Sequence, residues 1–287
     1  MSEFNKNTYI ILKEREALNC IYQGEFNKAE LIYKSLIREG LANYSIYINL
    51  AVIYAKRNDQ KERIFLLKKA IRLNPSSSTA FNNLGNAFRS LSNIDSAIDS
   101  YRKALSLKPD YPEAECNLGV ALQEKGENEL AITSFRRALE LKPNYPEALS
   151  NMGIALFNLG QIDEAIDSYK TAIKFKPKYH QAYLNLGNSY QAIGDHLSAQ
   201  DCYMEAININ PRYASAHWNL SLSYLLCGQY ELGWKYFHWR SKIKGASKPH
   251  ALPRIREYKS NTIVKGETLL VVTEQGLGDT IQYMRYI

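Results

Sequence analysis

Polar, apolar and small residues follow one another in an order that repeats every 34 residues along the chain. In each copy an asparagine precedes an apolar residue, and a small residue comes next. The asparagines are Asn49, Asn83, Asn117, Asn151, Asn185 and Asn219. The pairs that follow them are Leu50-Ala51, Leu84-Gly85, Leu118-Gly119, Met152-Gly153, Leu186-Gly187 and Leu220-Ser221. Six copies in one register indicate an internal structural repeat.

Three further residue types recur at equivalent positions of the copies, 34 residues apart, and we call each such set a column. The aromatic column is Tyr101, Phe135, Tyr169, Tyr203 and Phe237. The alanine column is Ala70, Ala104, Ala138, Ala172 and Ala206, and the proline column is Pro75, Pro109, Pro143, Pro177 and Pro211. A proline–glutamate pair at 112–113 and at 146–147 suits the first turn of a helix, and glycines at 126, 160, 194 and 228 suit its end. We therefore predict two helices per copy, with the aromatic column in the core.

These columns resemble the tetratricopeptide repeat, whose small, aromatic and proline positions they match. The resemblance implies an all-α fold, a right-handed superhelical solenoid of about seven helical hairpins. After an N-terminal extension at residues 1–9, the expected repeats are 10–43, 44–77, 78–111, 112–145, 146–179, 180–213 and 214–244. The first lacks the asparagine and the last lacks the alanine and proline columns, which is typical of terminal units in a solenoid.

In tetratricopeptide arrays the first helices line the concave wall. Each repeat asparagine precedes a packing residue, so it points about 100° away from the core, toward that wall. An amide both donates and accepts hydrogen bonds and suits the backbone of an extended peptide. The predicted peptide-binding residues are Asn49, Asn83, Asn86, Asn117, Asn151, Asn185, Asn188, Asn219, Arg89 and Gln123, with Asn82 and Asn158 as flanking positions. In the alternative interpretation these amides bond neighbouring repeats to each other.

The asparagine row is similar to the one in the solenoid arm of O-linked N-acetylglucosamine transferases, where such a row grips the main chain of protein substrates. The resemblance implies a protein–protein interaction scaffold with a protein or peptide partner. No cofactor is expected.

The pattern changes after the last repeat. A basic linker is expected at 245–267, followed by a strand signal at 268–273 and a turn with Gly276, Gly278 and Asp279. Together with Gly233-Trp234 and Trp239-Arg240, this run resembles the junction in bacterial proteins that fuse such repeats to a B-type glycosyltransferase domain. By that resemblance Asp279 corresponds to a catalytic carboxylate, and 268–287 begins an incomplete Rossmann-like domain.

This junction leaves a second function open: the chain is the substrate-recruiting arm of a glycosyltransferase. Because 20 residues from Thr268 onward cannot form two Rossmann-like domains, we do not expect the chain to catalyse a reaction alone. Self-association through the C-terminal segment is a weaker expectation.

Charge and composition narrow the partner class. The chain carries a formal charge of +7, and residues 232–287 hold ten Lys/Arg against four Asp/Glu, so residues 1–231 are close to neutral. We therefore expect no nucleic-acid partner. No apolar run reaches the length of a membrane span and no signal peptide is apparent, so a cytoplasmic location without membrane contact is predicted. Neither cysteines nor histidines show metal-ligand spacing, and no metal site is expected.

Overall fold

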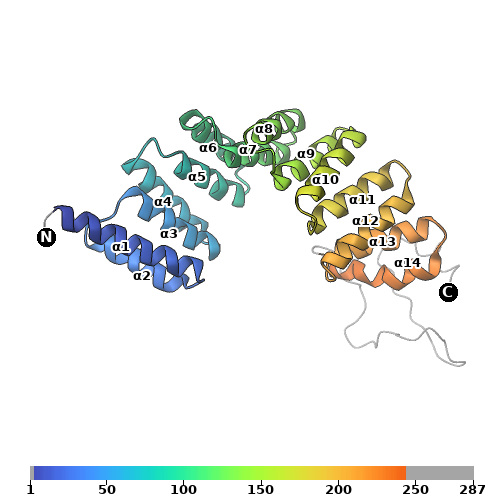
Figure 1. The fold of residues 1–287 in the computed structure, drawn as a ribbon, viewed down its shortest axis with the longest axis horizontal. Helices are drawn as coiled ribbons and strands as arrows, with labels where there is room; N and C mark the ends of the chain where they lie inside the picture. The colour runs from blue at the N-terminus through green and yellow to red at the C-terminus, as the bar shows by residue number, and fades with distance from the viewer. Residues whose placement is uncertain (1–2, 244–287) are drawn as a thin grey trace, which may run out of the picture. The chain divides into compact units, whose positions relative to one another are not determined.

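The computed structural model describes residues 3–243, with side chains from Lys6 onward. Within this range the protein contains fourteen α-helices and one 3-10 helix and no strand, which confirms the all-α prediction (Figure 1). The first ten helices are α1 (Glu3–Tyr22), α2 (Phe26–Arg38), α3 (Tyr44–Lys56), α4 (Gln60–Leu73), α5 (Ser78–Ser90), α6 (Ile94–Leu107), α7 (Pro112–Glu124), α8 (Asn128–Leu141), α9 (Pro146–Asn158) and α10 (Ile162–Phe175). The others are α11 (His180–Ala192), α12 (His196–Ile209), α13 (Ala214–Leu226), α14 (Tyr230–Phe237) and η1 (His238–Lys242).

The chain divides into two compact units, Met1–Pro177 with α1 to α10 and Lys178–Ile287, of which α11 to η1 are described. In each unit consecutive helices pack as hairpins, and the second helix of a hairpin packs on the first helix of the next. The predicted linker at 245–267 and the predicted strand-and-turn segment at 268–287 lie outside the described residues.

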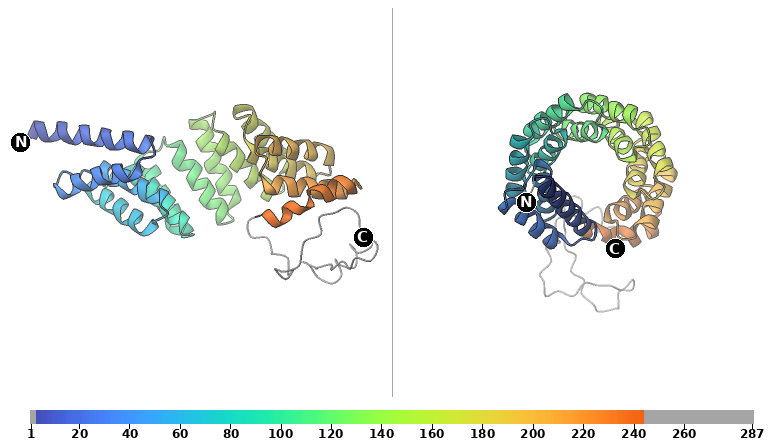
Figure 2. Two further views of the ribbon diagram at one scale, coloured as in Figure 1. Left: turned by 90° about the horizontal axis from the view of Figure 1, so that it is seen from below. Right: turned by 60° about the vertical axis from the view of Figure 1, so that its left-hand side comes forward.

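The helices of the first unit form two layers (Figure 2). The first helices of neighbouring hairpins contact each other, α3 with α5, α5 with α7 and α7 with α9. The second helices, α4, α6, α8 and α10, make no such contact with one another in the described part of this unit. A stack whose first helices touch while its second helices are spread apart curves toward the first helices. The first helices are therefore the inner layer of this unit, and the second helices are the outer layer.

The repeat pattern predicts the helix starts closely. Helices begin at six of the seven expected unit starts, namely Tyr44, Ser78, Pro112, Pro146, His180 and Ala214. The first helix begins at Glu3, before the expected start near Ile10, because residues 3–9 contain no proline or glycine that would stop it. Gly126 ends α7 with a φ of 89°, and in the equivalent turns Asn58 and Ser92 take the same left-handed conformation.

The small-residue column exists because an aromatic ring packs directly on it. A Cβ atom added to Gly119 would lie 2.6 Å from the ring of Phe135, which is completely buried. The same close approach occurs between Gly85 and Tyr101, at 2.5 Å, and within the second unit between Gly187 and Tyr203, at 2.5 Å. In the hairpin of α3 and α4 the two columns hold Ala51 and Leu67 instead. In this hairpin the larger alanine stands in place of glycine, and the smaller leucine stands in place of the aromatic ring.

We expect Gly119→Ala to lower the free energy of unfolding by about 1 kcal/mol. Crowding against Phe135 costs about 1–3 kcal/mol, and the higher helix propensity of alanine offsets about 1 kcal/mol of it. The double variant Gly119→Ala/Phe135→Leu copies the Ala51 and Leu67 pair. We expect a non-additive gain in it, measured by a urea double-mutant cycle. Strict additivity of the two substitutions would contradict the packing argument.

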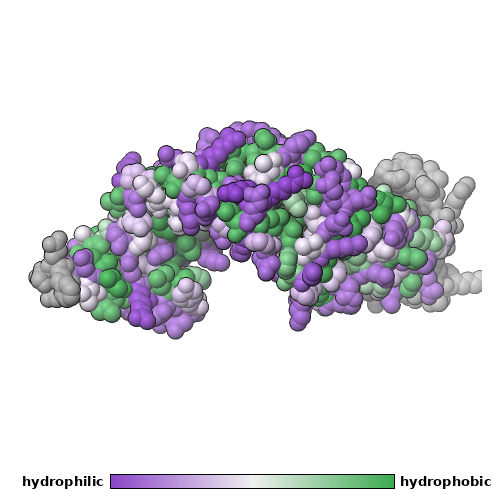
Figure 3. Space-filling model, turned by 45° about the horizontal axis from the view of Figure 1, so that its top comes forward, coloured by the Kyte–Doolittle hydropathy of each residue, from purple (hydrophilic) through white to green (hydrophobic). Residues whose placement is uncertain are grey.

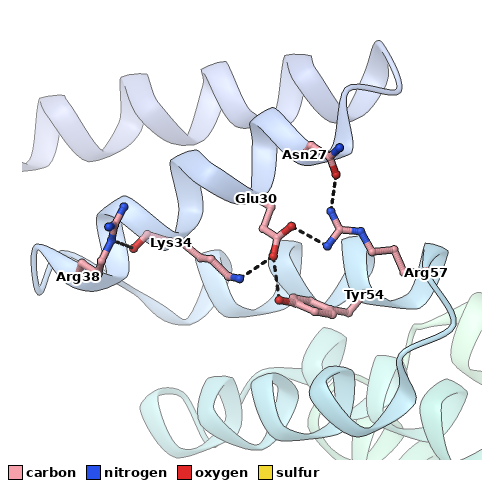
Figure 4. Close-up of polar contacts among 6 residues, drawn as sticks. All are labelled: Asn27, Glu30, Lys34, Arg38, Tyr54 and Arg57. Carbon is pink, nitrogen blue, oxygen red and sulfur yellow. Dashed lines mark hydrogen bonds and ion pairs between the residues drawn. The ribbon is translucent and has the colours of Figure 1, made fainter.

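A polar cluster joins the first hairpin to the second (Figure 4). The carboxylate of Glu30 on α2 accepts hydrogen bonds from Tyr54 Oη at 2.8 Å and pairs with Lys34 Nζ at 2.7 Å and with an Arg57 nitrogen at 2.6 Å. Burial by itself raises the pKa of Glu30. The hydrogen bonds from Lys34, Tyr54 and Arg57, with the charge of Arg57, outweigh burial and lower the pKa to about 2. The cluster therefore holds a carboxylate that is ionised at all ordinary pH values.

Candidate peptide-binding site

The repeat asparagines all lie on first helices. They are Asn49 on α3, Asn83 on α5, Asn117 on α7, Asn151 on α9, Asn185 on α11 and Asn219 on α13. All six are half-buried, so none is sealed inside a hairpin. The position follows from the neighbouring core residue: Leu50 and Leu220, which come next in the chain, are 2% and 1% exposed. One helical step turns the asparagine away from that buried direction. We call these six residues the asparagine row and treat its parts in the two units separately.

Two members of the row bond the preceding repeat. Asn117 Nδ2 donates to Asn82 Oδ1 at 3.0 Å, and in the second unit Asn219 Nδ2 donates to Asn188 Oδ1 at 2.7 Å. Asn117 keeps a second N–H group and its oxygen for other partners, whereas Asn219 also lies next to the hydroxyl of Tyr203. Asn82 is only 5% exposed, so it does not flank an accessible surface. Asn158 is exposed and donates to Asn128 at 3.5 Å.

Asn86 and Asn188 satisfy buried tyrosine hydroxyls. Asn86 Oδ1 accepts from Tyr101 Oη at 2.7 Å, and Asn188 Oδ1 accepts from Tyr203 Oη at 3.0 Å. Burial of Tyr101 raises its pKa to about 12, so the hydroxyl stays a donor. The hairpin of α7 and α8 has neither group, since Val120 and Phe135 occupy the two positions. A tyrosine fifteen residues after each asparagine was a sequence signal for this pairing. The pairing gives both amides a structural task beside any contact with a peptide.

Arg89 and Gln123 occupy equivalent positions on α5 and α7, and both are half-buried. Burial raises the pKa of Tyr101, and the charge of Arg89 offsets part of this increase. Gln123 Nε2 is buried and has no hydrogen-bond partner in the described part of the chain. In the second unit Gln191, the equivalent residue, accepts from Tyr203 Oη at 2.8 Å. Phe135 offers no such hydroxyl to Gln123.

The remaining row positions in the first unit have distinct surroundings. The side chain of Arg63 on α4 donates to the backbone oxygen of Asn83 at 3.4 Å, which ties α4 to α5. Asn151 lies next to the thiol of Cys116, whose pKa is raised by burial, so this buried thiol is protonated. Asn49 lies next to the buried ring of Tyr33. In the first unit the structure thus brings the predicted residues onto the inner helix layer, but it also engages several of them in packing.

The described residues contain no group of three metal-ligating side chains. In the same part of the chain no helix combines the length and the apolar character that a membrane span requires. Asp279, the carboxylate singled out by resemblance, lies outside the described residues.

Hydrophobic and hydrophilic residues are interspersed on the face shown in Figure 3.

Comparison with known proteins agrees with the repeat pattern. The model described as "TPR repeat" matches residues 85–126, 121–160 and 155–194, and the model described as "Tetratricopeptide repeat" matches 44–77 and 180–213. Together these matches cover more than half of the chain. The comparison with curated proteins gave no match.

Several solved structures are similar to this chain. MamA is 30% identical, with a TM-score of 0.50 over 54% of this chain and 91% of that one. YrrB, described as "a TPR protein with an unusual peptide-binding site", is 27% identical, with a TM-score of 0.52 over 64% of this chain and 95% of that one. The pilus biogenesis factor PilW, 22% identical, has a TM-score of 0.66 over 72% of this chain and 97% of that one, and shows likeness of fold alone. The 34-residue columns, the paired helices and these matches agree. The chain belongs to the tetratricopeptide repeat proteins.

Proposed function

We propose that this protein is an interaction scaffold in which the row asparagines within each unit hold an extended peptide or protein segment. The observation that carries the proposal is the half-buried state of all six row asparagines. A side chain in this state is held in place by its neighbours and still presents polar atoms at the surface. Similarity to YrrB, which is described as having an unusual peptide-binding site, supports the same class of function.

The row suits a peptide backbone better than any particular side chain. An amide can donate to a peptide carbonyl and accept from a peptide N–H with one side chain. The same amide at equivalent positions can form hydrogen bonds with the main chain, which is the same at every residue of a ligand. Side-chain selectivity then comes from the residues that differ between repeats, among them Arg89 and Gln123.

The test replaces Asn83, Asn151 and Asn185 by alanine, because these three make no hydrogen bond to a neighbouring asparagine. At about 0.5–1.5 kcal/mol for each lost hydrogen bond, partner affinity is expected to fall tenfold or more. Proteins retained by the immobilised wild-type chain are quantified by mass spectrometry, and the partner that is found is then titrated against each variant.

A matched control replaces Asn7, Asn144 and Asn208, which are exposed and lie off the row. This variant is expected to keep wild-type affinity. Circular dichroism checks that both variants are folded. Equal partner binding by the row variant and the wild type, with both folded, would remove the row from the function.

A further inference from the structure

Residues 1–231 are close to neutral as a whole, but one short segment within them has an excess of positive charge. Residues 56–72 hold seven Lys/Arg against two Asp/Glu, so the net charge of this short segment is more positive than the net charge of the whole of 1–231. The segment covers the end of α3 and nearly all of α4. The rest of residues 1–231 is therefore slightly acidic. Charge summed over the chain did not reveal this segregation.

The basic residues of α4 form a stripe with an aromatic residue in its middle. Lys61, Phe65, Lys68 and Arg72 stand at positions i, i+4, i+7 and i+11, which share one face of a helix. All four are exposed, and Phe65 is 50% exposed. Lys69 Nζ lies 4.6 Å from the centre of the Phe65 ring. At the end of the helix Leu73 is 56% exposed. We call Lys61, Phe65, Lys68, Lys69, Arg72 and Leu73 the α4 ridge.

Three cations of the ridge are not engaged in ion pairs in the described part of the chain. Within the described residues, Lys61, Lys68 and Arg72 form no ion pair, whereas Arg57 close by pairs with Glu30. The opposite face of α4 is committed to the core, where Leu67 and Ala70 are completely buried. The ridge therefore points outward from the outer layer of the first unit with its cationic groups unneutralised.

The repeat architecture does not require such a surface. At the positions of Lys61, Phe65, Lys68 and Arg72, helix α6 has Asp95, Asp99, Arg102 and Ser106, and helix α8 has Glu129, Thr133, Arg136 and Glu140. Only α2, with Leu31 65% exposed next to Lys34, comes near the same composition in the first unit. The ridge is thus a local feature of this chain.

We propose that the α4 ridge docks on an anionic lipid surface, in place of the sequence-based expectation of no membrane contact. Lysine and arginine attract acidic headgroups, while exposed phenylalanine and leucine side chains enter the boundary between headgroups and acyl chains. Duplex nucleic acid would use the cations but not Phe65 and Leu73. A helix on the outer, convex layer meets a flat bilayer without a complementary groove. The row asparagines of the first unit lie on the inner layer of that unit, so lipid contact leaves them accessible to a peptide.

The experiment is sedimentation of the full chain with vesicles of phosphatidylcholine and phosphatidylglycerol at 70:30, compared with vesicles of phosphatidylcholine alone. We expect binding to the anionic vesicles at low salt and its loss at about 0.5 M NaCl, where the screening length is only a few ångströms. The variant Lys61→Gln/Lys68→Gln/Arg72→Gln is expected to bind about a hundredfold more weakly. Phe65→Ser keeps every charge and is also expected to bind more weakly.

A matched control loses the same charge elsewhere. Arg102→Gln/Lys103→Gln/Lys174→Gln removes three exposed cations from α6 and α10 and is expected to bind vesicles as the wild type does. The basic residues beyond 243 are present in every variant, so they do not account for a difference between them. Equal loss in both triple variants, equal binding to both vesicle types or no vesicle binding would overturn the proposal. Binding of poly-L-glutamate or duplex DNA with no vesicle binding would also overturn it. Partner capture by the asparagine row is measured separately and fails independently.

Discussion

Replacement of Phe135 by alanine is expected to lower the free energy of unfolding by about 3–5 kcal/mol. The ring is completely buried and packs against Gly119, which has no side chain to fill the space that the ring leaves. Neighbouring hairpins pack on both sides of this one, so the cavity cannot close by local collapse. Because a solenoid is stabilised by intrinsic and nearest-neighbour terms, we expect the loss to weaken the adjacent repeats as well.

Urea unfolding followed by circular dichroism measures this effect. The control is Arg136→Ala, the next residue in the chain, whose side chain is exposed and whose ion pair with Glu164 spans 3.9 Å at the surface. Its effect is expected to stay within about 0.5 kcal/mol. A loss below about 1 kcal/mol for Phe135→Ala would mean that the aromatic column does not carry the core.

Acid is expected to weaken the junction between the first two hairpins by about 2–3 kcal/mol through Glu30. The folded pKa is about 2, against an ordinary value of 4.5. A lowered folded pKa stabilises the native state fully above pH 4.5, and the contribution disappears as the pH falls toward 2. The full shift corresponds to about 3 kcal/mol, and solvent around the half-exposed Lys34 and Arg57 reduces it somewhat.

The comparison of wild type with Glu30→Gln isolates this contribution. At pH 7 the variant is expected to be less stable, and the difference in unfolding free energy is expected to shrink steadily between pH 4.5 and pH 2. Glu39→Gln, at an exposed carboxyl in the turn after α2, serves as the control and is expected to follow the wild type. A difference between wild type and Glu30→Gln that stays constant from pH 7 to pH 2 would contradict the proposed ionised cluster.

The 34-residue columns were sufficient to predict the helices, the turns and the core. Proline at the start of α7 and glycine at its end act through local backbone geometry, which is legible in sequence. The six starts from Tyr44 to Ala214 were predicted correctly for this reason. The start of α1 at Glu3 was not predicted, because a helix continues wherever no residue stops it.

The candidate site was only partly predictable. Periodicity placed the row asparagines on the right helices and one step away from the core. It could not show that Asn117 bonds Asn82, since this contact joins residues of neighbouring repeats. The fifteen-residue spacing was a sequence signal for the pairing of Asn86 and Asn188 with tyrosine hydroxyls, but it did not establish the hydrogen bonds. Periodicity also could not show that Asn82 is buried, although the residue stands beside Asn83.

By itself the sequence determined that the chain is a stack of helical hairpins, because each element depends on residues close together along the backbone. Only the tertiary structure decided which polar groups are used internally and which face outward. The charge of α4 illustrates this: its basic residues are countable in the sequence, but whether Lys61, Lys68 and Arg72 form ion pairs is a property of packing. Hydrogen bonds and ion pairs are formed between elements in space, and a one-dimensional repeat does not specify them.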